Sequence, residues 1–288
     1  MSVSTAAESR MRAQKWRAVC GRGAGLLGLA KARRRKTKVE VMLGRKERPV
    51  ASRIHAALLG VRARVLATLV AAYERHLAST EKAGGVYDRI IEEILDQIDA
   101  RGVAVAVVDS LGDELRAVFR QAGLTGVAEV GFDASAAIVS QVDVSATAYA
   151  AARGAELVTA ISDSTRNELR TLVSEAVEEG WSVDTFSDAI VDSTSFSDAR
   201  ATMIARTELA FAHVQGNLDG WRVSDEVESK VWLASAGACP ICQALDGTEV
   251  GLGEMFDYDG EAIDGPPGHP NCRCDVLPVL KEKEKDDD

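Results

Sequence analysis

Aromatic side chains are scarce in this 288-residue sequence, and so are long uncharged apolar runs. Aromatic residues make up 5% of the chain and hydrophobic residues 46%, a mixture that favours helices packed through small side chains over a β-sandwich. No apolar run approaches the roughly 20 residues of a membrane-spanning helix. Residues 18–30 faintly resemble a signal sequence, but Arg22 interrupts their apolar part. We therefore expect no membrane span.

Cysteine is also scarce outside one C-terminal window, since only Cys20 of the five cysteines lies elsewhere. Such clustering indicates a reducing compartment and a metal site rather than a disulfide scaffold. The window contains a Cys-x2-Cys pair and a His-x2-Cys pair, and a spacer rich in Gly, Asp and Pro separates them. Each pair can aim two ligands at one point, as a structural zinc site requires. The sequence predicts zinc bound by Cys239, Cys242, His269 and Cys272, with Cys274 as the alternative ligand.

Other uses of these cysteines are disulfide formation, dithiol redox chemistry and metal-dependent hydrolysis. A redox dithiol needs its first cysteine at the start of a helix, and the segment after Cys242 is too short before Asp246-Gly247 to be that helix. A hydrolytic zinc needs a vacant coordination position, whereas four protein ligands close the site. We therefore predict a structural metal, no catalytic residues and no small-molecule substrate.

The net charge of −10 conceals a strong asymmetry. Residues 1–50 contain 14 Lys/Arg and three Glu, a net charge of +11, and the remaining 238 residues have a net charge of −21. We predict that residues 1–48 form a flexible basic arm. One interpretation is that the arm contacts DNA phosphates or the surface of an acidic partner. The other is that it is a solvated extension. Residues 281–288 are predicted to be a charged tail. The candidate nucleic-acid contacts are Arg33, Arg34, Arg35, Lys36 and Lys38.

The body of the chain predicts helices, with a helical region at residues 49–160. Pro49 is expected to break the chain before an apolar stripe that recurs every three or four residues from Ile54 to Leu77. Further stripes span residues 90–98 and 111–119, and Gly123 is expected to close the second of them. Residues 124–143 are interpreted as a linker or a short strand-bearing segment, and residues 145–161 as an alanine-rich helix.

Three more helices are predicted between residues 161 and 228. Ser164 or Thr165 is expected to cap the first helix, which ends at Gly180. Ser182 is expected to cap a short second helix. The third helix is expected to run from near Ser197 to about Trp221. On this third helix Arg206 and Glu208 point in different directions. We interpret them as ties between the helix and either the C-terminal zinc lobe or the turn that follows the helix.

A small β lobe is predicted at residues 229–280. Strands are expected at 230–234, at 248–250 as a hairpin partner, and at 273–279 as a returning strand. The predicted fold class is therefore mainly α, with a helical N-terminal body followed by a small α+β, zinc-stabilised C-terminal lobe.

Several motifs occur in a fixed order after residue 160. They are Ile204-Ala205-Arg206-Thr207-Glu208, Asn217, Val231-Trp232, Cys239-x2-Cys242, Leu245-Asp246-Gly247 and His269-Pro270-Asn271-Cys272-Arg273-Cys274. This ordered set resembles the Mu F-like head morphogenesis family, the minor capsid proteins of tailed bacteriophages. The resemblance covers roughly residues 160–280, so that residues 161–228 would be the helical part of a Mu F-like domain.

This resemblance implies a structural, low-copy protein of the phage head. Its expected partners are the portal protein and the capsid and scaffold proteins, and phage genomic DNA is a further expected contact. The expected location is the interior of the phage head in the virion, and the host cytoplasm during assembly. The alternative is a zinc-stabilised DNA-binding protein acting outside the virion, which would need specific affinity for duplex DNA. The resemblance carries over no catalytic residue.

Overall fold

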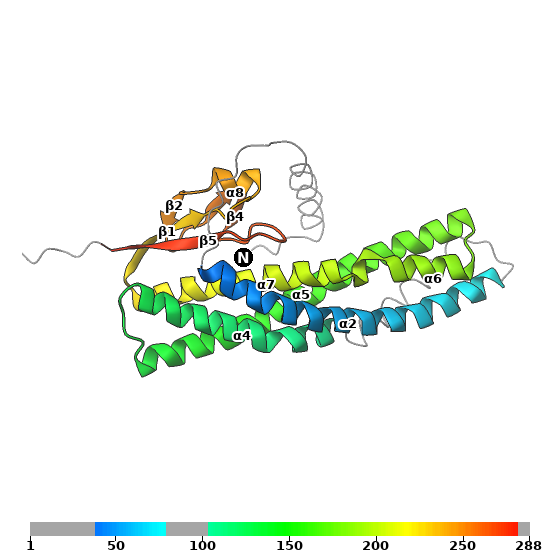
Figure 1. Cartoon of the computed structure of the whole chain (residues 1–288), viewed down its shortest axis with the longest axis horizontal. Helices are drawn as coiled ribbons and strands as arrows, with labels where there is room; N and C mark the ends of the chain where they lie inside the picture. Colours follow the sequence, from blue (N-terminus) through cyan, green and yellow to red (C-terminus); the bar gives the residue numbers. More distant parts are fainter. Residues whose placement is uncertain (1–37, 79–102, 282–288) are drawn as a thin grey trace, which may run out of the picture. The chain divides into compact units, whose positions relative to one another are not determined.

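The structure, a computed structural model, describes residues 38–78 and 103–281. The predicted nucleic-acid contacts Arg33 to Lys36, the stripe at 90–98 and the tail after Lys281 lie outside these residues, and Lys38 is described only as the start of a helix. The prediction of a mainly helical chain with a small C-terminal sheet is confirmed (Figure 1). The elements are α2 (Lys38–Leu77), α4 (Val103–Glu129), α5 (Ala136–Glu179), α6 (Val183–Asp192), the 3-10 helix η1 (Thr194–Phe196), α7 (Asp198–Ser224), β1 (Val227–Leu233), α8 (Pro240–Ala244), β2 (Glu249–Gly251), β3 (Phe256–Tyr258), β4 (Glu261–Ile263) and β5 (Asp275–Leu280).

The described residues divide into two compact units, which we treat separately. The helical unit consists of Gly44–Arg120 and Asp143–Leu209. The lobe unit consists of three segments of the described chain: residues 38–43, residues 121–142 and residues 210–281. The domain boundaries predicted from the sequence, at 48/49, 160/161, 228/229 and 280/281, stay predictions.

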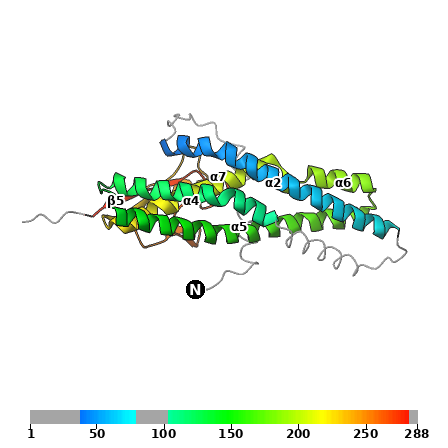
Figure 2. The ribbon, with the colours of Figure 1, turned by 90° about the horizontal axis from the view of Figure 1, so that it is seen from below.

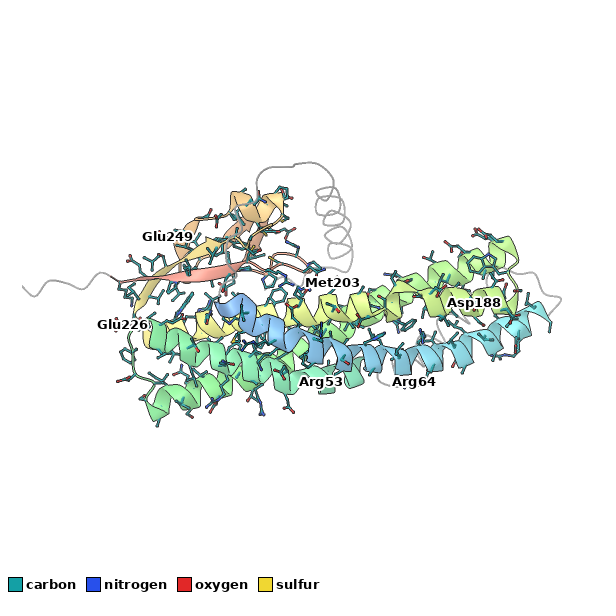
Figure 3. All side chains as sticks on the ribbon, viewed as in Figure 1. Arg53, Arg64, Asp188, Met203, Glu226 and Glu249 are labelled. Atoms are coloured by element: carbon teal, nitrogen blue, oxygen red, sulfur yellow. The ribbon has the colours of Figure 1, made fainter. Side chains whose placement is uncertain are left out.

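Helix α2 runs through Pro49, so the predicted break there is wrong. Proline removes one helical N–H donor, but Val50 and Ala51 directly after it are buried, and packing outweighs the local preference. Apolar side chains recur along one face of α2, while Arg53 and Arg64 lie on its exposed side (Figure 3). The buried positions of this face are Val50, Ala51, Ile54, Leu58, Val61, Val65, Leu69, Ala72 and Tyr73.

One described segment, Val41–Arg75, could cross a membrane by length and composition alone. Arg62 and Arg64 interrupt it, and its regularly spaced apolar positions are buried within the protein. A core helix passes the same length and composition test. A single helix of this kind is weak evidence for a membrane span, and 28% of its most apolar 18-residue window is buried inside the protein.

Helix α5 is continuous from Ala136 to Glu179, where the sequence predicts a linker followed by two helices. Ser164 and Thr165 are not caps, because their hydroxyls donate backward to the carbonyls of Ala160 and Ile161, at 2.9 and 2.8 Å. Serine and threonine can make this bond inside a helix without ending it. Gly180, with φ of +66°, does follow the end of α5 as predicted.

The predicted starts of the next two helices are confirmed. The Ser182 hydroxyl accepts a hydrogen bond from the Thr185 N–H at 3.1 Å, and α6 begins at the next residue, Val183. The Ser197 hydroxyl accepts from the Arg200 N–H at 3.1 Å, directly before α7. Figures 1 and 2 show α6 running beside α2.

Aromatic packing and hydrogen bonds connect α2 to α6 and to the end of α5. The ring of Tyr73 packs on Phe186 with centroids 4.8 Å apart. The Tyr73 hydroxyl lies 3.0 Å from the carbonyl oxygens of both Ala176 and Trp181. These contacts satisfy the polar end of an otherwise buried side chain.

Two ion pairs attach α7 to its helical neighbours through Arg206 and Glu208. Buried Glu208 accepts two hydrogen bonds from Arg153 of α5, at 2.7 and 2.9 Å. Arg206 donates to Glu47 of α2 at 3.3 Å. The two side chains do point in different directions, and each binds another helix of the helical unit. A two-pronged arginine–carboxylate pair of this kind fixes orientation as well as charge.

In the lobe unit, α4 and α7 approach each other closely at glycines. A Cβ built on Gly220 would lie 2.2 Å from the Gly123 carbonyl oxygen, and one on Gly126 would lie 3.1 Å from Trp221 Nε1. The prediction that Gly123 closes its helix is therefore wrong, because α4 continues to Glu129. Gly123 lets two helix backbones approach, which the sequence of one helix cannot reveal.

The lobe sheet has the order β2-β1-β5 with antiparallel pairing, so the predicted hairpin and returning strand are confirmed (Figure 1). A second sheet, β3-β4, turns at Asp259 and Gly260, which both have positive φ. The sequence analysis missed this hairpin, although Asp-Gly between short apolar stretches is a strong hairpin signal. The core of the lobe unit joins the end of α7 to the sheets and the cysteines; its large buried members include Val214, Leu218, Trp221, Trp232, Phe256, Tyr258 and Val276.

Candidate metal centre

The first ligand pair lies on one turn of helix. Cys239 is the residue before α8, and its carbonyl accepts the Gln243 N–H at 2.9 Å. Pro240 occupies the first helical position, where its missing N–H is not needed. Cys239 and Cys242 are three residues apart and so lie on the same side of this turn. Cys239 does precede a helix, but α8 has only five residues and ends before Asp246-Gly247.

The second pair lies on a β-turn. The Cys272 N–H donates to the His269 carbonyl at 3.1 Å, with Pro270 and Asn271 as the central residues. Asn271 has φ of +66°, and a proline followed by a residue with positive φ is the signature of a type II turn. The His-Pro-Asn-Cys spacing thus places the two candidate ligands at the two ends of one tight turn.

The structure brings all five candidate ligands together in two overlapping groups of three. The ligand atoms of Cys239, Cys242 and His269 lie within 4.8 Å of one another, and so do those of Cys242, Cys272 and Cys274. Cys242 belongs to both groups. Cys242, Cys272 and Cys274 are buried and Cys239 is half-buried.

The distances fit a metal better than a disulfide. The sulfurs of Cys242 and Cys272 are 3.8 Å apart, far beyond the roughly 2.05 Å of an S–S bond, and the four described cysteines are free. Zinc–sulfur bonds of about 2.3 Å in a tetrahedron place two sulfurs about 3.8 Å apart. Three thiols and one imidazole, or four thiols, are donor sets of four-coordinate structural zinc sites.

The thiols of this cluster perturb one another. Hydrogen bonds with Cys272 and Cys274, together with burial, raise the pKa of Cys242 far above its usual range. Hydrogen bonds from Cys242 and Cys272 lower the pKa of Cys274 to about 2. The thiols therefore do not ionise independently, and several thiolates this close together need a cation beside them.

His269 is oriented for binding through one ring nitrogen. Its Nδ1 lies 2.8 Å from the Pro270 carbonyl oxygen. A proton on Nδ1 would donate to that oxygen and leave the Nε2 lone pair for a metal, the usual arrangement of histidine ligands.

A charge cluster fixes the loop that leads to the second pair. Fully buried Lys230 of β1 donates to Asp264, which also accepts from Arg222 at 2.9 Å. Burial alone would raise the pKa of Asp264, but the hydrogen bonds from Lys230 and Arg222 hold it below its usual value. The cluster ties the chain after β4 to β1 and to the end of α7. No sequence pattern indicated it, because the three residues are far apart in the chain.

Comparison with known families gives a match in the C-terminal half of the chain. Residues 167–277 match the family described as Phage Mu protein F like protein. This region is Mu F-like. The match begins within α5 and ends within β5, so it includes α7, both sheets and all five candidate ligands. It confirms, over this part of the chain, the resemblance inferred from the motifs. No curated protein and no solved structure matches the chain.

Proposed function

We propose that this protein is a minor head protein of a tailed phage, present in few copies and associated with the portal and the capsid interior during head assembly. The Mu F-like match over residues 167–277 is the observation that carries the proposal. The protein would assemble with portal, capsid and scaffold proteins in the host cytoplasm and remain in the virion. Its role is structural rather than catalytic.

The lobe at residues 229–280 would hold one zinc ion, with residues 161–228 as its helical support. Cys239, Cys242 and Cys272 would bind it together with His269, and Cys274 is the alternative fourth ligand. A zinc ion would supply a cation that neutralises the buried thiolates and cross-links α8 to the turn before β5. Four protein ligands would leave no coordination position for a reacting water, consistent with a structural role.

The basic N-terminal segment, residues 1–48, would contact packaged DNA. Its net charge of +11 over residues 1–50 supports this part of the proposal, and the candidate contacts are Arg33, Arg34, Arg35, Lys36 and Lys38. Such binding is electrostatic, so it should weaken steeply with salt. Removing residues 1–37 should reduce retention of duplex DNA at low salt and leave the zinc content unchanged.

The test of the proposed function is purification of assembled heads from cells that produce this protein with its phage. We expect the protein in portal-containing heads at a copy number far below that of the major shell protein. Recovery only as a free protein that binds specific duplex DNA at physiological salt would contradict the proposal and favour action outside the virion.

A further inference from the structure

Tyr258 of β3 reaches the first ligand pair of the candidate metal centre. Its hydroxyl oxygen lies 3.5 Å from the sulfur of Cys242 and 3.7 Å from the sulfur of Cys239. Both distances are within hydrogen-bonding range for sulfur. Tyr258 is therefore placed to contact both members of the Cys-Pro-Ile-Cys pair with one polar group.

The ring of Tyr258 is held on two sides. Trp232 of β1 stacks on it with centroids 5.8 Å apart, and the side chain of Tyr258 is fully buried. Gly268 lies against the ring so closely that a Cβ there would be 2.5 Å from Cζ. Gly268 directly precedes His269, so the same ring contacts the chain that carries the second ligand pair. The hydroxyl is thus fixed in position by the packing around it.

Bound thiolates need such a donor. A zinc ion with three thiolates and one neutral imidazole leaves one net negative charge in a buried site, and buried charge is costly without hydrogen bonds. A neutral tyrosine hydroxyl can donate its proton to thiolate sulfur and withdraw part of that charge. Hydrogen-bonding partners outside the ligand shell commonly orient metal ligands and tune their affinity.

We propose that Tyr258 is a positioning residue of the metal centre, whose hydroxyl donates to the sulfurs of Cys239 and Cys242 and whose ring sets the distance between the two ligand pairs. This inference rests on the proposed zinc site and extends it to a residue outside the ligand set. The hydroxyl accounts for part of the zinc affinity. The ring accounts for the alignment of the turn that carries His269.

The test compares the full chain with its Tyr258→Phe variant, which keeps the ring and removes only the hydroxyl. Zinc affinity is measured by competition with a chromophoric chelator. We expect the variant to bind one zinc with about 10- to 100-fold weaker affinity, the range for loss of an outer hydrogen-bonding partner. With Co²⁺ in place of zinc, the sulfur-to-cobalt absorption band should move to lower energy, because the thiolates donate more charge without the hydrogen bond. A change in packing alone would leave the position of that band unchanged.

A matched control is Tyr149→Phe, since the Tyr149 hydroxyl in α5 is buried and has no hydrogen-bond partner within the described ranges. It should leave both the affinity and the cobalt band unchanged. Gly268→Ala must displace the Tyr258 ring, so it should weaken zinc binding although all five candidate ligands are still present.

The two levels of the proposal fail in different ways. Wild-type protein that binds zinc, combined with a Tyr258→Phe variant of equal affinity and identical cobalt spectrum, would overturn the role of Tyr258 alone. Wild-type protein that binds neither metal would overturn the zinc site and the role of Tyr258 together.

Discussion

The two units of this protein bury their cores by different means. In the helical unit, aliphatic side chains recur along long helices, as Ile54, Leu58 and Val61 do on α2. In the lobe unit, the strands have three to seven residues, and three of the buried core members are the cysteines Cys242, Cys272 and Cys274. A helix of 40 residues can present a long apolar face, whereas a few short strands cannot bury enough surface to be stable alone. We therefore expect that the lobe depends on a cross-link and that the helical unit does not.

The largest effect should come from Cys242→Ser, because Cys242 belongs to both groups of candidate ligands. Loss of zinc removes binding free energy on the order of 10 kcal/mol, so the sheet β2-β1-β5 should unfold. Elemental analysis should show loss of the metal, and hydrogen exchange should show loss of protection from Val227 to Leu280.

The control for this variant is Cys20→Ser, because Cys20 is the one cysteine outside the ligand window. It should keep the metal and the protected sheet. A Cys242→Ser variant that retains both would show that the lobe is stable without the ion.

Leu58→Ala tests the other side of the comparison. Leu58 is fully buried on α2, and truncating such a leucine costs about 2–5 kcal/mol through lost burial and the cavity left behind. Denaturant unfolding should show this loss in the helical unit, with the zinc content unchanged. Leu77→Ala, at an exposed position of the same helix, should have little effect. An equal loss in both variants would contradict the assignment of Leu58 to the core.

A smaller effect should distinguish the two candidates for the fourth ligand. If His269 binds zinc through Nε2, His269→Ala should weaken zinc binding more than Cys274→Ser, because only the first variant loses a ligand. Zinc competition titrations of the two variants provide the measurement. The opposite order would assign the fourth position to Cys274 and give a site with four thiolates.

The smallest effect concerns Glu168 and the pH dependence of the free energy of unfolding of the helical unit. Burial raises the pKa of this carboxyl, but hydrogen bonds from Ser195, Ser193 and Thr194 lower it more, so the net shift is downward. A depressed pKa contributes stability above the unfolded value of about 4.3 and loses it as the pH falls through the folded value. Glu168→Gln should therefore be less stable than wild type at pH 7, and the difference should shrink below about pH 4.

Urea unfolding of the helical unit between pH 7 and pH 3 measures this difference. Glu175→Gln, at an exposed position of the same helix, should follow the wild-type profile. A constant difference between Glu168→Gln and wild type across this range would show that the carboxylate charge is not involved.

The sequence predicted features that depend on neighbouring residues better than features that depend on packing. Ser182 caps a helix and another helix begins directly after Ser197 as expected, and the two ligand pairs lie on tight turns, because each depends on a few adjacent residues. The helix boundaries predicted at Pro49 and Gly123 are wrong. Burial of the neighbouring side chains decides the role of Pro49, and a close backbone contact decides that of Gly123. Packing between elements overrides local preference at such positions.

The candidate site was predictable in its ligands but not in its surroundings. The Cys-x2-Cys and His-x2-Cys spacings pointed to four of the residues that the structure brings together, and the fifth, Cys274, was the predicted alternative ligand. Tyr258, Gly268 and the Lys230–Asp264 pair contact the site or its loop from other parts of the lobe. Only the Asp-Gly turn after Tyr258 offered a signal, and it indicated the hairpin rather than the contact with sulfur.

The central claim is that one metal ion stabilises the lobe and not the helical unit. Hydrogen exchange measured on the full chain before and after zinc removal by a strong chelator tests this claim most directly. We predict one zinc per chain before treatment, loss of protection in β1, β2 and β5 after it, and unchanged protection in residues 54–73 of α2. Protein that carries no zinc, or a sheet equally protected after chelation, would contradict the account.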